Sequence, residues 1–127
     1  MTKEKINKLS ERVIGCAIEV HRRLGPGLLE SVYDKALCIE LKREGIAFEK
    51  QKTLHVTYRE KPVGIFRVDV LVEETIVLEL KSVERHDPVF EATILSYLKL
   101  GNYRLGLLIN FNSKLLKNGI KRFVNNL

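Results

Sequence analysis

The sequence predicts an α/β domain in which helices pack on a sheet. Apolar residues alternate with polar ones over 64–72 and again over 75–82, which indicates two half-buried strands. Apolar residues recur at helical spacing over 4–24. A short, almost wholly apolar run over 103–111 is typical of a strand buried on both faces. The chain of 127 residues fits a single domain, 1–127, with one core.

The expected elements follow in the order α, α, β, β, β, α, β, α. The helix over 4–24 ends at a glycine-proline-glycine break, because these residues interrupt helical geometry. A second helix runs from about 28 to 44 and stops at Gly45, a suitable C-terminal cap. A strand over 46–59 then precedes the two alternating strands.

The second half of the chain returns to helix after those strands. Asp87 and Pro88 begin a helix, since proline is tolerated in a first turn, and this helix stops near Gly101. The apolar strand over 103–111 follows. A final amphipathic helix is expected from the apolar positions Leu116, Ile120, Phe123 and Leu127.

The two alternating strands bring acidic residues together. If the chain reverses around position 74, both apolar sets fall on one face, because a one-residue slip would turn every side chain over. This register places Asp69 opposite Glu79 on the other face, with Cβ atoms roughly 5 Å apart. Two like charges at that distance favour a bound cation, and Lys81 follows on the same face. The alternative is that these polar side chains are simply solvated.

Glu30 supplies a third acid at the start of the second helix. It is aligned with Leu37 and Leu41, so we expect it to point along the side that packs on the sheet. The alternative is an acid that only complements the helix dipole in the first turn.

Charge and composition restrict the class of protein. The net charge of +6 favours a polyanionic partner such as nucleic acid, with a merely basic protein as the equal alternative. There is no run of ~18 apolar residues, so no membrane span is expected, and the first residues lack the apolar core of a signal peptide. Cys16 and Cys38 are expected to be free buried thiols, which favours a reducing, cytoplasmic location.

One motif matches a known family. Gly27, Glu30 and Tyr33 form the pattern G-x-x-E-x-x-Y. With the lone strand acid Asp69 and the E-x-K triplet that begins at Glu79, the chain resembles the GxxExxY family, a branch of the PD-(D/E)XK nuclease superfamily. The resemblance implies a restriction-endonuclease-like αβββαβ core with a mixed four-stranded sheet, here with an extra helix at each end.

The resemblance also implies chemistry. It predicts a nuclease that uses Mg²⁺ or Mn²⁺ to hydrolyse phosphodiester bonds of DNA, with RNA as an alternative. Asp69 and Glu79 would be metal ligands together with the carbonyl of Leu80, and Glu30 would bind through water or position a second ion. Lys81 would orient the attacking water or stabilise charge on the phosphoryl oxygens.

Further residues are expected around this site. Arg67, and after it Arg85 and Lys99, are candidates for contacts with the nucleic-acid backbone. Tyr33 is expected to be a packing residue with its hydroxyl near the site. Thr93 stands where relatives often carry a glutamine, and its shorter side chain favours a second interpretation, a non-catalytic module that binds nucleic acid or a protein. The sequence leaves open a monomer or a homodimer.

Overall fold

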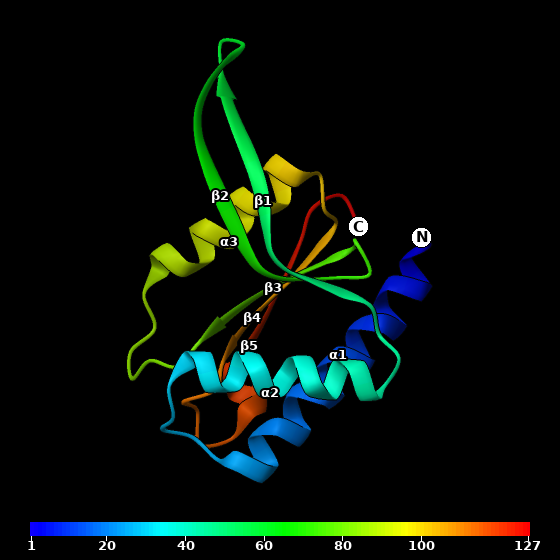
Figure 1. Cartoon of the computed structure of the whole chain (residues 1–127), viewed down its shortest axis with the longest axis vertical. Coiled ribbons are helices and arrows are strands. Elements are labelled where there is room, and N and C mark those ends of the chain that lie inside the picture. The colour runs from blue at the N-terminus through cyan, green and yellow to red at the C-terminus, as the bar shows by residue number, and fades with distance from the viewer.

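A computed structural model describes all 127 residues and places a mixed sheet between helices on both of its faces (Figure 1). The elements agree with the expected order up to residue 111. In chain order they are α1 (Lys3–Leu24), α2 (Glu30–Arg43), β1 (Phe48–Tyr58), β2 (Lys61–Val72), β3 (Ile76–Lys81), α3 (Pro88–Gly101), β4 (Leu105–Asn110), a 3₁₀ turn (Leu116–Gly119) and β5 (Ile120–Val124).

The sheet has the strand order β1-β2-β3-β4-β5. Strands β3 and β4 are parallel, because α3 returns the chain to the same edge between them, and the other neighbours are antiparallel. Residues Leu105–Ile109 of β4 are all buried, which confirms a strand covered on both faces. The carboxyl ends of β3 and β4 therefore lie side by side.

The predicted register between β2 and β3 is confirmed. Val70 pairs with Leu78, and Val72 pairs with Ile76, so the hairpin is centred on position 74. The apolar pattern was sufficient to predict this register, because a shift by one residue would have turned the whole apolar set to the opposite face.

Two hydrophobic cores lie on opposite faces of the sheet, and β2 contributes to both. Val70 packs in the core under α1 and α2, whereas Val68 packs in the core under α3. The expectation that Phe66 and Val68 share a face with Val70 is therefore wrong. The cause is a twist opposite Asp69, where Gln51 of β1 has a positive φ of 54° and the paired ladder omits one step.

The C-terminal segment differs from the prediction. The expected final helix is instead a 3₁₀ turn followed by β5, so the sheet has five strands rather than four. Ile120 pairs with Ile109 of β4, which would otherwise present an open edge. The turn ends at Gly119, where an added Cβ would lie 2.4 Å from the carbonyl oxygen of Asn110. Only glycine allows that close approach.

Other expectations concern the whole chain. Cys16 and Cys38 are both buried and both free, as predicted. None of the helices combines the length and the apolar character that crossing a membrane requires.

Candidate active site

The site begins where β2 separates from β3. Their ladder ends at the pair Val70 and Leu78, and beyond it carboxylates take the place of backbone acceptors. The amide of Asp69 donates to Oε1 of Glu79 at 3.2 Å, and the amide of Leu80 donates to Oδ2 of Asp69 at 2.9 Å. The divergence of the strands thus fixes both acids against each other, with their carboxyls close enough to share a hydrogen bond when the pair holds a proton.

Burial sets the electrostatics of this pair. Glu79 is 6% exposed and is the only charged residue in the buried set, while Asp69 is half-buried. Burial, followed by the nearby Asp69 carboxylate, raises the pKa of Glu79 from 4.5 to about 8. Burial also raises the pKa of Asp69, against the opposing effect of its hydrogen bond from Leu80. Near neutral pH the pair retains a proton, which a cation could replace.

Lys81 lies close enough to the acids to oppose the rise in their pKa, but it forms no ion pair with them. It is half-buried, and no carboxylate lies within ion-pair distance of its ammonium group. Instead, Nζ lies 4.5 Å from the centroid of the Phe90 ring. This contact holds a cation beside the acids by a cation–π interaction, so its charge remains available to a ligand.

A small hollow of about 80 Å³ adjoins this lysine on the α3 side of the sheet. Its lining includes His86 and Lys121, which both contact the carboxylate of Glu91. Asn110 at the end of β4 accepts a hydrogen bond from the amide of Val83 and donates one to its carbonyl. These bonds fix the chain directly after β3, and sequence patterns gave no signal for them.

Glu30 occupies the first position of α2 and is exposed, so it is not buried against the sheet. It still lies within electrostatic reach of the strand acids. Partial loss of hydration raises its pKa, the Asp69 carboxylate adds to the rise, and Lys81 opposes it. Glu30 therefore lies at the rim of the site.

The loop before α2 is held by Tyr33. This side chain is fully buried and stacks on Phe111, with ring centroids 4.6 Å apart. Its hydroxyl donates to the carbonyl of Gly25 at 2.6 Å and accepts from the amide of Leu28 at 3.1 Å. Gly27, between them, has a φ of 96°, a conformation that favours glycine. Gly27 and Tyr33 thus position the turn that presents Glu30, as a packing role predicts.

Two residues near the acids, Asp34 and Tyr97, were not predicted from the sequence as part of the site. Asp34 lies one helical turn after Glu30, and its carboxylate raises the pKa of both Glu30 and Asp69. Lys50 of β1 pairs with Asp34 at 2.9 Å. The spacing of four residues between the helix acids was the available signal.

Tyr97 of α3 is the other. It belongs to the α3 core, as its helical spacing predicts, and it is also within electrostatic reach of the acid pair. Burial, then the charges of Glu79 and Asp69, raise the pKa of its phenol.

None of the remaining candidates forms a hydrogen bond or an ion pair with the acids. Thr93 uses its hydroxyl inside α3, donating to the carbonyl of Val89 at 2.8 Å, and makes no hydrogen bond to the strand acids. Arg67 is exposed on β2, Arg85 is exposed in the loop before α3, and Lys99 is exposed near the end of α3. They are spread over three elements around the site.

The donor set suits a hard divalent cation. No group of three or more histidine, cysteine or acidic side chains lies close enough together to hold an ion. Two carboxylates are nevertheless sufficient for Mg²⁺, which usually keeps several waters and binds through one or two carboxylates plus phosphate oxygens. Thiolates and imidazoles, which zinc prefers, are absent from the pair.

Comparison with known proteins gives one match. The family model of the PD-(D/E)XK nuclease superfamily matches residues 7–123, which span all of the helices, strands and acids described above except the chain ends. No curated protein and no solved structure matched the chain. The match and the mixed five-stranded sheet agree, and the chain belongs to the PD-(D/E)XK nuclease superfamily.

Proposed function

We propose that the protein is a nuclease of the GxxExxY branch that hydrolyses phosphodiester bonds of DNA with Mg²⁺ or Mn²⁺ bound at Asp69 and Glu79. The observation that carries this proposal is the pair formed by buried Glu79 and half-buried Asp69, which has no ion-pair partner. Keeping two carboxyls together in a poorly hydrated position destabilises the fold, so such a pair indicates a functional site. Membership of a nuclease superfamily supports the reaction class.

Asp69 and Glu79 would hold the ion through the oxygens that their backbone hydrogen bonds leave free. The carbonyl of Leu80 would add a ligand, and Glu30 would act from the rim through water. When bound, a divalent ion neutralises phosphate charge and lowers the pKa of a coordinated water. The fixed geometry of the two strands would keep the reacting groups aligned.

Lys81 would stabilise the negative charge that grows on the phosphoryl oxygens. Its ammonium lies over Phe90 rather than on a carboxylate, so it is available to a substrate. Removal of one such electrostatic contact typically slows a reaction about 10²–10³-fold. Arg67, Arg85 and Lys99 would meet the phosphate backbone outside the site.

A second candidate function has one observation in its favour. The hydroxyl of Thr93 is occupied inside α3, so this position offers no long polar side chain to the site. A protein that binds DNA or a protein partner without cutting would need none. Binding without cleavage under every divalent ion would select this alternative.

Cleavage of supercoiled plasmid and of end-labelled DNA tests the proposal. The wild type should cut with Mg²⁺ or Mn²⁺ and not with EDTA, and Asp69→Asn and Glu79→Gln should each lose at least about a hundredfold in rate. Glu40→Gln is the matched control, because Glu40 is an acid on the far side of α2 that faces α1.

Calorimetric titration separates the metal site from the reaction. The wild type and Glu40→Gln should bind Mg²⁺ alike, and the two site variants should lose measurable binding. Equal ion binding by all four proteins would remove the metal site from this account.

A further inference from the structure

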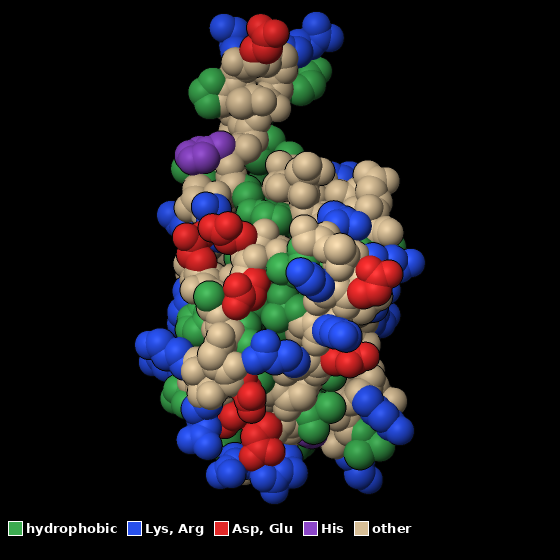
Figure 2. All heavy atoms as spheres, turned by 90° about the vertical axis from the view of Figure 1, so that its right-hand side faces the viewer, with side chains coloured by type: hydrophobic (Ala, Val, Ile, Leu, Met, Phe, Trp, Pro, Cys, Tyr) green, Lys and Arg blue, Asp and Glu red, His purple; other side chains and the backbone are tan.

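A hairpin arm projects from the body of the molecule, and the proposed site does not use it. The pairing of β1 with β2 continues to Tyr58 and Lys61, far beyond Val70, the last residue of β2 that pairs with β3. Figure 1 shows the outer end of this two-stranded ribbon beyond the helices, and Figure 2 shows it as a narrow projection from the body of the molecule. We define the arm as residues 52–68. A two-stranded hairpin has little stability by itself, so an arm of this length suggests a binding partner.

The base of the arm is anchored, but its outer part is free. Leu54 and Val68 pack in the core under α3, and Phe66 contacts Tyr97 with ring centroids 5.8 Å apart. The arm leaves the sheet beside Asp69, where the ribbon twists. The arm and the acid pair therefore both begin at Asp69, where the ladder between β2 and β3 has ended.

The outer part exposes large apolar side chains. Tyr58, Val63 and Ile65 are 64%, 61% and 58% exposed. Apolar residues at this exposure on a projecting ribbon contribute nothing to the core, so they are free for contacts with another molecule.

Three of the four lysines and arginines of the arm form no ion pair. At its base Lys52 is paired with Glu49 at 3.4 Å, whereas Arg59, Lys61 and Arg67 have no acidic partner. Arg59 lies over the ring of Tyr58, 5.7 Å from its centroid. One acid, Glu60, accompanies them at the tip. The arm thus offers a positive field together with apolar contact groups.

The turn at the tip has charged residues at two positions whose backbone conformation glycine or asparagine would adopt with less strain. Arg59 and Glu60 both have positive φ, 49° and 69°, in a two-residue turn between Tyr58 and Lys61. This geometry usually takes Asn-Gly or a similar pair. The turn therefore displays an arginine at a conformational cost, which is consistent with use of its charge.

We propose that the arm binds duplex DNA by placing this ribbon in a groove, with Arg59, Lys61 and Arg67 on phosphates and the apolar side chains toward the bases. The inference rests on the proposed function and deepens it, because it assigns the substrate as double-stranded B-form DNA. The major groove of B-DNA is about 12 Å wide and admits a two-stranded ribbon. The deep, narrow major groove of an RNA duplex does not admit one.

Charge favours DNA over a second copy of this chain as the occupant. Two identical arms would bring unpaired cations together, which is unfavourable. DNA presents the opposite charge along its whole length, and the chain carries a net charge of +6.

Binding of a labelled 24-base-pair DNA duplex, measured by fluorescence anisotropy in EDTA, tests the arm without cleavage. The double variant Arg59→Gln/Lys61→Gln should weaken binding about tenfold at 100 mM salt and reduce the salt slope by about 1–2. The matched control Lys3→Gln/Lys8→Gln removes two exposed charges from α1 and should change the affinity less than about twofold.

Two further measurements address the groove and the apolar contacts. Val63→Ser/Ile65→Ser should weaken DNA binding about threefold or more without changing the salt slope, because no phosphate contact is lost. With an RNA duplex of the same sequence, the arm and control variants should have equal affinities. Thermal melting of each variant should match the wild type, since all four substituted arm residues are exposed.

The proposal is overturned if the arm variant and the control bind DNA equally, or if the arm variant loses as much affinity for RNA as for DNA. It is also overturned if light scattering finds a dimer that the arm substitutions dissociate while DNA affinity is unchanged. Failure of the nuclease proposal has a different result: arm-dependent DNA binding in EDTA with no cleavage under any divalent ion.

Discussion

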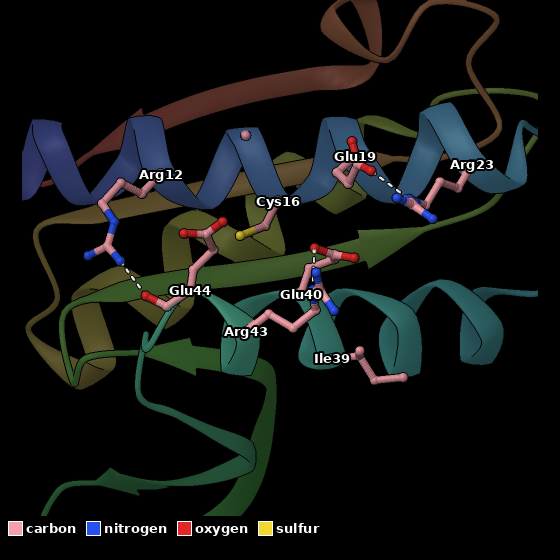
Figure 3. A pocket seen from close by; sticks show the side chains of 9 residues that line it. Arg12, Cys16, Glu19, Arg23, Ile39, Glu40, Arg43 and Glu44 are labelled. Carbon is pink, nitrogen blue, oxygen red and sulfur yellow. Dashed lines mark hydrogen bonds and ion pairs between the residues drawn. The ribbon is translucent and has the colours of Figure 1, made fainter.

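Two groups of acids in this small domain have opposite electrostatic conditions. In the groove between α1 and α2, a cavity of about 610 Å³, arginines alternate with glutamates (Figure 3). Hydrogen bonds from Arg22 and Arg23 lower the pKa of Glu19 there from 4.5 to about 2. At the divergence of β2 and β3, burial and Asp69 raise the pKa of Glu79 to about 8.

The difference separates structural charges from functional ones. Glu19 and Glu40 are partly exposed and each pairs with an arginine of its own helix, so ordinary surface ion pairs on two facing helices explain that cavity. Glu79 is buried, Asp69 is half-buried, and neither forms an ion pair, so burial of their charge destabilises the protein even though Lys81 opposes part of this effect. Perturbed acids, more than cavity volume, therefore locate the candidate site in this molecule.

The largest expected effect is on the reaction. Lys81→Met should lower kcat about 10²–10³-fold in the DNA cleavage assay, because it removes charge stabilisation of the phosphoryl oxygens. Mg²⁺ binding should persist in this variant, since the carboxylates remain. Arg43→Met in the groove is the control, because it deletes a cation that pairs with Glu40 and should leave cleavage within about twofold. Equal loss in both variants would refute a special role for Lys81.

The second effect is on stability. In EDTA the melting temperature of the wild type should fall as the pH rises from about 5 to 8. The sign follows from linkage, because folding raises the pKa of Glu79 from 4.5 to about 8. The contribution of the Glu79 carboxyl to the free energy of unfolding is therefore complete below pH 4.5, where the group is protonated in both states. It is lost as the pH rises through about 8, where the folded protein loses the proton. Glu79→Gln should therefore stabilise the metal-free protein at pH 8 by about 1–2 kcal/mol, or roughly 4–8 °C.

Metal provides the control for this effect. At pH 8, Mg²⁺ should raise the melting temperature of the wild type and not that of Glu79→Gln, because only the wild type can exchange its proton for the ion. A wild type whose stability is flat between pH 5 and 8 would contradict the perturbed pair.

The acid pair could be predicted from sequence because one physical rule decided it. Strict alternation fixed the register about position 74, and the register placed Asp69 beside Glu79. The backbone bonds that hold these carboxyls were not predictable. They depend on the separation of β2 from β3 on the Asp69 side of Val70, where the ladder between these strands ends, and the apolar pattern does not encode this separation.

Two other features were hidden for identifiable reasons. Gln51 has a positive φ at the point where the ribbon twists, and the sequence gave no sign of this because positive φ is usual for glycine or asparagine and not for glutamine. The spacing of the apolar residues Leu116, Ile120, Phe123 and Leu127 is helical, which is why the sequence predicts a helix where the structure has a turn and β5. The Asn118-Gly119 dipeptide was the signal against a helix, and the open edge of β4 decided the outcome.

The third effect concerns the loop between α1 and α2, which connects the groove helices and presents Glu30 at the acid pair. Tyr33→Phe removes the hydroxyl that bonds both Gly25 and Leu28 and should destabilise the protein by about 1–2 kcal/mol in urea unfolding. Cleavage should fall further than stability explains, because the turn that presents Glu30 is loosened. Tyr58→Phe, which changes an exposed hydroxyl on the arm, should unfold like the wild type. Unchanged unfolding of Tyr33→Phe would contradict this anchoring.

The smallest effect is expected in the groove. Glu19 has a lowered folded pKa, so its contribution is present above pH 4.5 and is lost as the pH falls toward 2, the opposite direction to Glu79. Because Glu19 is partly exposed and both arginines are well exposed, its pairs with Arg22 and Arg23 are screened by water and salt. Glu19→Gln should therefore shift the melting temperature at pH 7 by less than about 1 °C and leave cleavage unchanged. A loss of cleavage in Glu19→Gln would connect the groove to the reaction and remove the distinction between satisfied and unsatisfied acids on which the assignment of the site depends.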